Sequence, residues 1–224
     1  MKHYLIWDLP TRIFHWGLVL CLLGLWYTAE SEGEYIDLHM KLGYVVIGLL
    51  CFRLIWGIIG TRHARFMSFV PTPTKIKAYV KRPSDYPGHN PLGALMVFAL
   101  LALVLVQAST GLFIDDDIFS AGPYNGVLSS SLESLMNTIH HNGFDLILIA
   151  AAIHILAVAY YWRVKGKNLV KPMLTGKKSE KDVRSDDAIN HSKLLIALFV
   201  AVVVALFVYW LVVLNAPVVE EFYY

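Results

Sequence analysis

Five long apolar stretches, separated by polar segments, dominate the sequence. Most approach the ~20 residues that a helix needs to cross a bilayer, and the first and shortest gains its N-terminal turn from residues 9–12. Pro91 opens the third stretch and suits the first position of a helix, where a missing N–H costs nothing. The stretches cover residues 13–28, 38–60, 91–113, 139–162 and 194–214. This pattern predicts an all-α integral membrane protein.

Composition and charge add an orientation. The chain is 57% hydrophobic and 16% charged, with a mean hydropathy of +0.55, which is typical of a membrane protein and unlike a soluble domain with one core. Seventeen of the nineteen Lys and Arg residues precede residue 13 or lie in segments 62–82 and 163–193, whereas the alternate segments hold acidic residues and no basic ones. The positive-inside rule therefore places the N-terminus in the cytoplasm and the C-terminus outside.

The fourth stretch carries a histidine near each end. His140 and His154 are fourteen residues apart, which on an α-helix is almost four turns and about 21 Å, so both rings leave the same face. One metal ion cannot bridge that distance, but two stacked haems can each take one ligand from such a helix. His141 would point about 140° away from His154, which makes it a bystander.

Each of these histidines needs an opposite ligand at its own depth. If the fourth helix runs from outside to inside, His140 lies near the outer surface and His154 near the inner one. His15, in TRIFHW, begins the first helix at the inner surface and pairs with His154. His39, in DLHMKLGY, begins the second helix at the outer surface and pairs with His140.

Other polar residues suggest roles around these pairs. Arg53, fourteen residues after His39, and Arg12, one turn before His15, suit bidentate binding of a haem propionate, although both could instead extend to the membrane surface. His89 and Asn90, at the inner surface, are candidate donors to a quinone carbonyl, with a helix cap as the alternative for Asn90. Two further residues, Gln107 and Thr110, could simply bond across helices. His3, His63 and His191 fall in basic flanks and are expected to be solvated.

The chain divides into three regions. Residues 1–165 form a four-helix haem-binding bundle, residues 166–192 a basic cytoplasmic loop, and residues 193–224 a fifth C-terminal transmembrane helix with a periplasmic tail. The loop is polar and Lys-rich, a composition typical of mobile segments. Because no CxxCH motif occurs, covalent c-type haem is not supported.

Several motifs together resemble a known family. TRIFHW, LHMKLGYVVIGLLCFRLIWGIIGTRHARF, RPSDYPGHNPLGA and IHHNGF followed by His154 are similar to the b-type cytochrome subunits of membrane-bound nickel-iron hydrogenases and to the wider bacterial di-haem cytochrome b family. The likeness covers residues 7–162, about seven-tenths of the chain. It implies two haem b groups, each held by two histidines, with the ligands on His15, His39, His140 and His154.

The resemblance also implies a function. The family passes electrons between a periplasmic redox protein, a hydrogenase or a c-type cytochrome, and quinone in the bacterial inner membrane. Membrane lipid is then a partner and nucleic acid is not. One alternative is a stand-alone superoxide or quinone oxidoreductase, which would show a basic outer surface. Another is a non-haem metal or proton transporter, which would need carboxylate or thiolate companions, and only Asp145 lies near His140 in the sequence.

Overall fold

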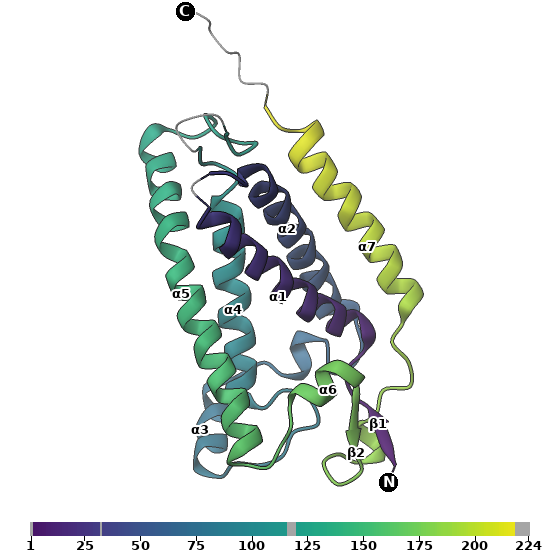
Figure 1. Cartoon of the computed structure of the whole chain (residues 1–224). Coiled ribbons are helices and arrows are strands. Elements are labelled where there is room, and N and C mark those ends of the chain that lie inside the picture. Colours follow the sequence, from purple (N-terminus) through teal and green to yellow (C-terminus); the bar gives the residue numbers. More distant parts are fainter. Residues whose placement is uncertain (1, 32, 116–119, 218–224) are drawn as a thin grey trace, which may run out of the picture.

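The computed structural model describes residues 2–31, 33–115 and 120–217 and is mainly helical (Figure 1). Five helices are long and apolar enough to cross a membrane. They are α1 (Leu9–Ala29), α2 (Ile36–Ile59), α4 (Pro91–Thr110), α5 (Ser130–Arg163) and α7 (Leu194–Tyr209), the last of which continues as a π-helical turn at Trp210–Leu214. The prediction of an all-α membrane protein with five spans is confirmed.

The helix boundaries have local causes. Helix α1 begins at Leu9, as predicted, because the side chain of Asp8 caps it and accepts a hydrogen bond of 2.7 Å from the Thr11 backbone N–H. Helix α5 begins at Ser130, well before the predicted start at residue 139. Its first turns are polar, so they extend the helix beyond the apolar stretch that hydropathy detects.

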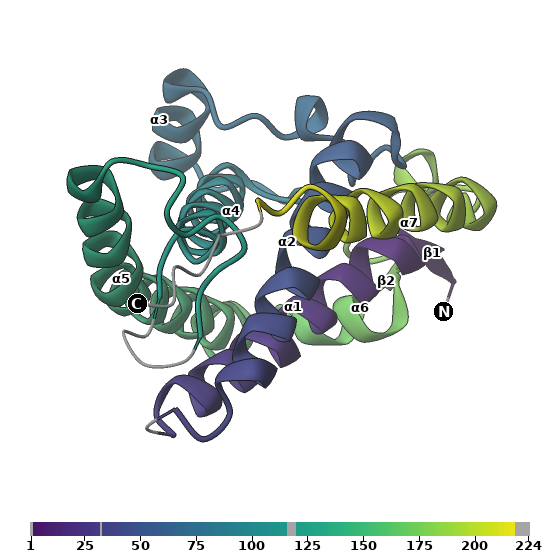
Figure 2. The same ribbon diagram turned by 90° about the horizontal axis from the view of Figure 1, so that it is seen from above.

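The five long helices form two packed pairs and one peripheral helix. Helix α1 packs along α2, α4 packs along α5, and α2 and α4 join the pairs. Helix α5 has at most marginal backbone contact with α1 and α2, and Figure 2 shows α5 and α4 together on one side of the bundle. Helix α7 packs on the outside of α2. The result is the predicted four-helix bundle with a peripheral fifth helix.

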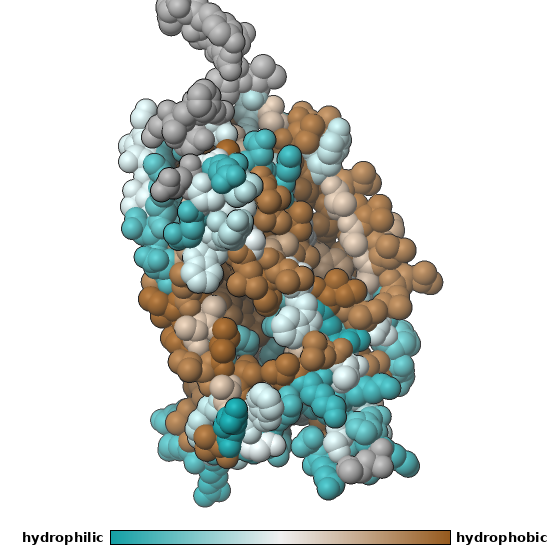
Figure 3. All heavy atoms as spheres, viewed as in Figure 1, coloured by the Kyte–Doolittle hydropathy of each residue, from teal (hydrophilic) through white to brown (hydrophobic). Residues whose placement is uncertain are grey.

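The two ends of the bundle differ in charge and structure. One end, called the basic end, carries residues 2–8, 60–90 and 164–193, with the short helices α3 (Pro73–Lys81) and α6 (Val170–Thr175). The other, called the acidic end, carries the connections between α1 and α2 and between α4 and α5. Figure 3 shows an apolar belt between two more hydrophilic ends, which is the surface expected of a multi-pass membrane protein.

The segment from 166 to 192 is more ordered than its composition predicts. Its strand β2 (Lys177–Ser179) pairs antiparallel with β1 (His3–Leu5), and the Gly176 carbonyl accepts hydrogen bonds from the backbone N–H groups of Ile6 and Trp7, at 2.9 and 3.0 Å. Val183 is buried against the same two residues. The expectation of a mobile loop is therefore wrong, because main-chain bonds and one small apolar cluster tie this segment to the N-terminus.

The main core lies at the middle of the bundle. It consists of the fully buried residues Val46 and Leu50 from α2, Val104 from α4 and Ile147 from α5, with partly buried side chains of α1 around them. On α5, Ile147 lies midway between His140 and His154. The core therefore forms an apolar layer between the two ends.

Candidate haem sites

The four predicted histidines meet in two pairs. The ring centres of His15, from α1, and His154, from α5, are 6.4 Å apart. Those of His39, from α2, and His140, from α5, are also 6.4 Å apart. Both pairs span the space where α5 has little contact with α1 and α2. The structure thus brings together the same partners that helix periodicity and depth predict.

This spacing fits a metal bound between the rings. Two imidazoles on opposite sides of one metal ion have ring centres about 6.2 Å apart, since each metal–nitrogen bond is about 2.0 Å and each ring centre lies about 1.1 Å beyond its nitrogen. A side chain added at Gly43, one turn after His39, would meet nothing within 4 Å. The arrangement therefore has the ligand spacing of a haem held between two imidazoles, with open space at Gly43 one turn beyond His39.

At the acidic end, both rings have a hydrogen-bond partner at Nδ1. The main-chain carbonyl of Gln107 accepts a hydrogen bond of 2.9 Å from Nδ1 of His140. Because a carbonyl oxygen has no proton to donate, the proton must be on Nδ1. The Thr28 hydroxyl lies 3.0 Å from Nδ1 of His39, and it can accept from this nitrogen while donating to a carbonyl of its own helix, Gly24 at 2.9 Å or Leu25 at 3.1 Å. His140 therefore carries its proton on Nδ1, the Thr28 hydroxyl allows the same tautomer for His39, and in that tautomer Nε2 keeps the lone pair that a metal needs.

Helix α4 fixes His140 by close contact. A Cβ at Gly111 would lie 2.8 Å from Cε1 of His140, and a Cβ at Gly143 would lie 2.7 Å from Oε1 of Gln107. The Gln107 amide in turn donates a 2.7 Å bond to the His140 carbonyl, and Thr110 lies 3.3 Å from Nδ1. The predicted cross-helix bonding of Gln107 and Thr110 is confirmed.

At the basic end, the rings lack such bonds. Nδ1 of His15 is buried and has no hydrogen-bond partner among the described residues. His154 likewise makes no hydrogen bond with any residue in the described ranges. The His15 ring instead meets the edge of Trp16, with ring centres 5.0 Å apart. The two pairs therefore share their spacing and differ in their surroundings.

Arg53 is buried at the same end of the bundle as the His15–His154 pair. Only 3% of it is exposed, its Nη1 donates a 3.1 Å bond to the Ala64 carbonyl, and its guanidinium carbon lies 4.5 Å from the centre of the Phe66 ring. Within the described part of the chain, no carboxylate comes within 4.0 Å of it. The Arg53 guanidinium is therefore enclosed by the protein.

Two further charged residues flank this end. The guanidinium of Arg12 donates to the Leu174 carbonyl, while its Nε is buried without a partner in the described ranges. The carboxylate of Asp8 is 1% exposed and accepts bonds from Trp56 and Thr61 in addition to the cap bond. Sequence reasoning assigned no role to Asp8, whose only signal was its position before Pro10.

His89 lies in an aromatic cluster at the same end. Its ring centre is 4.7 Å from that of Trp7 and 4.4 Å from that of Phe69, and its Nδ1 is buried with no partner among the residues described. Burial, and secondarily repulsion from Arg53, lower the pKa of His89 to about 3. The imidazole is therefore neutral and has a free polar atom for a ligand.

Asn90 and His63 are committed to the protein itself. Oδ1 of Asn90 caps α4 by accepting from the Gly93 N–H at 2.7 Å, and Nδ2 donates to the Tyr161 hydroxyl at 3.0 Å, which confirms the cap. His63 was expected to be solvated, and this is wrong. It is buried, with Nε2 2.7 Å from the Asp187 carbonyl, because segment 166–192 folds over it.

Comparison with known proteins identifies the family. A sequence model of prokaryotic cytochrome b561 matches residues 6–176. The chain belongs to the prokaryotic cytochrome b561 family. It is accordingly a membrane b-type cytochrome that carries haem b and takes part in electron transport.

The relatives of this cytochrome share one description. It is 28% identical to a probable Ni/Fe-hydrogenase B-type cytochrome subunit of Azotobacter chroococcum, over 81% of this chain and 90% of that protein. The subunit of the same description from Rhodobacter capsulatus is 24% identical, over 80% and 82%. The probable Ni/Fe-hydrogenase 1 B-type cytochrome subunit of Escherichia coli K12 is 29% identical, over 50% and 59%. No solved structure matches the chain significantly.

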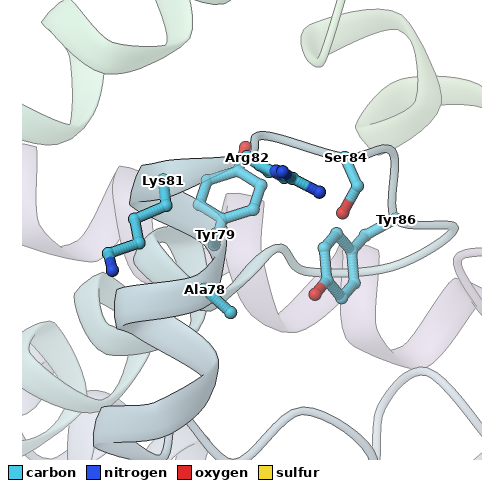
Figure 4. Close-up of a pocket in the computed structure, with 6 residues that line it drawn as sticks. All are labelled: Ala78, Tyr79, Lys81, Arg82, Ser84 and Tyr86. Carbon is cyan, nitrogen blue, oxygen red and sulfur yellow. The ribbon is translucent and has the colours of Figure 1, made fainter.

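A hollow on α3 is separate from the histidines of the cytochrome. Figure 4 shows Arg82 and Ser84 pointing toward each other between the rings of Tyr79 and Tyr86, while Lys81 points away. The Tyr79 hydroxyl is 2.6 Å from that of Tyr161. Because the hollow has no histidine and no buried polar group without a partner, it does not belong to the haem sites.

Proposed function

We propose that this cytochrome holds two haem b groups, each between two histidines. His39 and His140 would be the axial ligands at the acidic end, and His15 and His154 those at the basic end. The observation that carries the proposal is the equal ring spacing of 6.4 Å in both pairs, which matches a metal bound between two imidazoles. Each haem supplies one-electron transfer, and two histidine ligands leave no position on the metal for a substrate.

The arginines would receive the propionates of the basic-end haem. Arg53 is buried with no carboxylate within 4.0 Å among the described residues, and Arg12 has a buried Nε without a partner there. A guanidinium in a low-dielectric environment needs an anion, and a propionate has the geometry that Arg binds with two parallel hydrogen bonds. These residues would then orient the macrocycle.

Quinone would react at the basic end, beside His89. The neutral imidazole has a buried Nδ1 beside the rings of Trp7 and Phe69, and in the tautomer protonated on Nδ1 it would donate to a carbonyl oxygen of the flat quinone ring. Asn90 has a positioning role in this proposal, because both ends of its amide are bonded within the protein. It fixes the start of α4 directly after His89.

An extrinsic redox protein would exchange electrons at the acidic end. The relatives named as hydrogenase cytochrome subunits favour a hydrogenase over a c-type cytochrome as this partner. The positive-inside rule puts the acidic end in the periplasm, with the N-terminus in the cytoplasm and the protein in the inner membrane. The acidic surface argues against a superoxide oxidase, which would need a basic one.

A non-haem transporter has less support. No group of three His, Cys, Asp or Glu side chains that could hold a metal ion occurs within the described ranges, and Asp145 is exposed. A pair of imidazoles alone is a poor cage for a free divalent ion but fills both axial positions of a haem.

Haem stoichiometry tests the proposal. The pyridine haemochrome absorbance of the purified chain, measured against protein concentration, should give two b haems per chain, with a low-spin reduced-minus-oxidised spectrum. One haem per chain would remove one of the two sites. A folded preparation without haem would reject the electron-transfer role altogether.

A further inference from the structure

We propose that hydrogen bonds in the protein make the acidic-end haem the one with the lower reduction potential. Thr28 and the Gln107 carbonyl would be the positioning groups that set this order. Electrons on the cytochrome would then run downhill from the acidic end to the basic end. The inference rests on the proposed function, because it assumes that both histidine pairs hold haem.

The first support is the bonding of the acidic-end ligands. Nδ1 of His140 donates to the Gln107 main-chain carbonyl at 2.9 Å, and Nδ1 of His39 lies 3.0 Å from the Thr28 hydroxyl, which can accept from it while donating to the Gly24 carbonyl. Donation from Nδ1 raises the basicity of the opposite nitrogen. A more basic ligand stabilises the ferric state over the ferrous state and lowers the potential.

The second support is the absence of such acceptors at the basic end. Nδ1 of His15 is buried without a partner, and His154 has no hydrogen bond, in each case among the residues that the structure describes. These imidazoles are less basic than those at the acidic end. Relative to the ferric state, the ferrous state is therefore more stable at the basic end than at the acidic end.

The third support is charge. Arg53 and Arg12 lie at the basic end, and positive charge favours the added electron. Asp8 opposes them, but it is a single carboxylate whose charge is spread over three hydrogen bonds. The membrane-embedded cation at the acidic end, Lys41, is exposed, whereas Arg53 at the basic end is buried. The charge of Lys41 is therefore the better screened of the two.

The order of potentials has a functional consequence. Ligand bonding and buried charge act in the same direction, and the apolar layer of Val46, Leu50, Val104 and Ile147 separates the ends. An electron entering from a periplasmic donor would therefore come to rest on the haem next to the quinone region. This favours quinone reduction over quinol oxidation.

Redox titration of variants with a single haem assigns the potentials. His15→Ala should leave one component, at the lower of the two wild-type potentials, and His39→Ala should leave the higher one. The reverse assignment would overturn the inference while leaving the two haem sites intact. Loss of both haems in each variant would instead count against the proposed function.

Thr28→Val tests the hydrogen bond itself. The two side chains have nearly the same shape, so the variant removes one acceptor and little packing. The lower potential should rise, changing the electron-sharing constant between the haems by about threefold to tenfold, while the higher potential stays unchanged. Thr28→Ser should restore the wild-type value.

Thr138→Val is the matched control, because the Thr138 hydroxyl bonds only to the Ser134 carbonyl of its own helix. It should leave both potentials unchanged. Equal potentials in Thr28→Val and the wild type, with two haems retained, would contradict the proposed role of Thr28.

Discussion

The two histidine pairs have the same ring spacing and different surroundings. At the acidic end, His39 and His140 have hydrogen-bond partners at Nδ1, and Gly111, which follows α4, lies close against the His140 ring. At the basic end, His15 and His154 have no such bonds to described residues, and buried charges lie nearby. The spacing comes from helix geometry, whereas the surroundings come from the neighbouring helices. The acidic-end pair is thus held by hydrogen bonds to its surroundings, whereas the basic-end pair has none to the described residues.

Removing one ligand from either pair should have the largest effect, because each histidine serves only one haem site. His140→Ala should lose the acidic-end haem and retain the other, and His154→Ala should do the reverse, because each ring serves one site. Haem content should fall from two to one per chain in both variants. His141→Ala should retain two, since Nδ1 of His141 bonds to the Asn137 carbonyl of its own helix. Equal loss of both haems in each variant would contradict the pairing.

Gly111 should matter only at the acidic end. A Cβ there would lie 2.8 Å from Cε1 of His140, so Gly111→Ala should displace that ring and substantially lower occupancy of the acidic-end haem. The matched control is Gly17→Ala, where the new Cβ would make ordinary contacts of 3.8 Å with Leu49. Haem content and the reduced spectrum check both variants. An unchanged acidic-end haem in Gly111→Ala would show that His140 is free to move.

Arg53 should matter only at the basic end. Arg53→Gln removes the buried cation proposed to bind a propionate, and it should weaken haem binding there by about tenfold and lower the potential of that haem. Arg62→Gln is the control, since Arg62 is exposed and pairs with Asp187. Haem retention during dilution, followed by absorbance, measures the effect. Equal retention by the two variants would exclude a propionate role for Arg53.

The sequence predicts the positions of the ligands better than their environment. The fourteen-residue separation of His140 and His154 needs only the helical repeat, and the depths of His15 and His39 follow from alternating chain direction. The acceptor for His140 is a main-chain carbonyl, which has no signature in the sequence. The burial of His63 depends on a segment whose polar composition resembles that of a mobile loop.

A pH dependence of stability is also expected at the basic end. Burial lowers the pKa of His89 from 6.5 to about 3, so between these values the unfolded chain binds a proton that the folded chain does not. The free energy of unfolding should therefore fall as the pH drops below 6.5, by about 1.4 kcal/mol per pH unit well inside that window.

His89→Phe should remove this contribution, so the thermal midpoint of the detergent-solubilised protein should depend less steeply on pH between 6.5 and 3. His191→Phe, at an exposed position, is the control and should keep the wild-type slope. The same slope in His89→Phe as in the wild type would mean that His89 becomes protonated in the folded protein.

Low-temperature electron paramagnetic resonance of the oxidised protein tests the central claim most directly. Two low-spin ferric signals are expected, each typical of a haem with two histidine ligands. One should vanish with His39→Ala and the other with His15→Ala. A high-spin signal in the wild-type protein, or a single low-spin signal that depends on all four histidines, would contradict two separate sites with two histidines each.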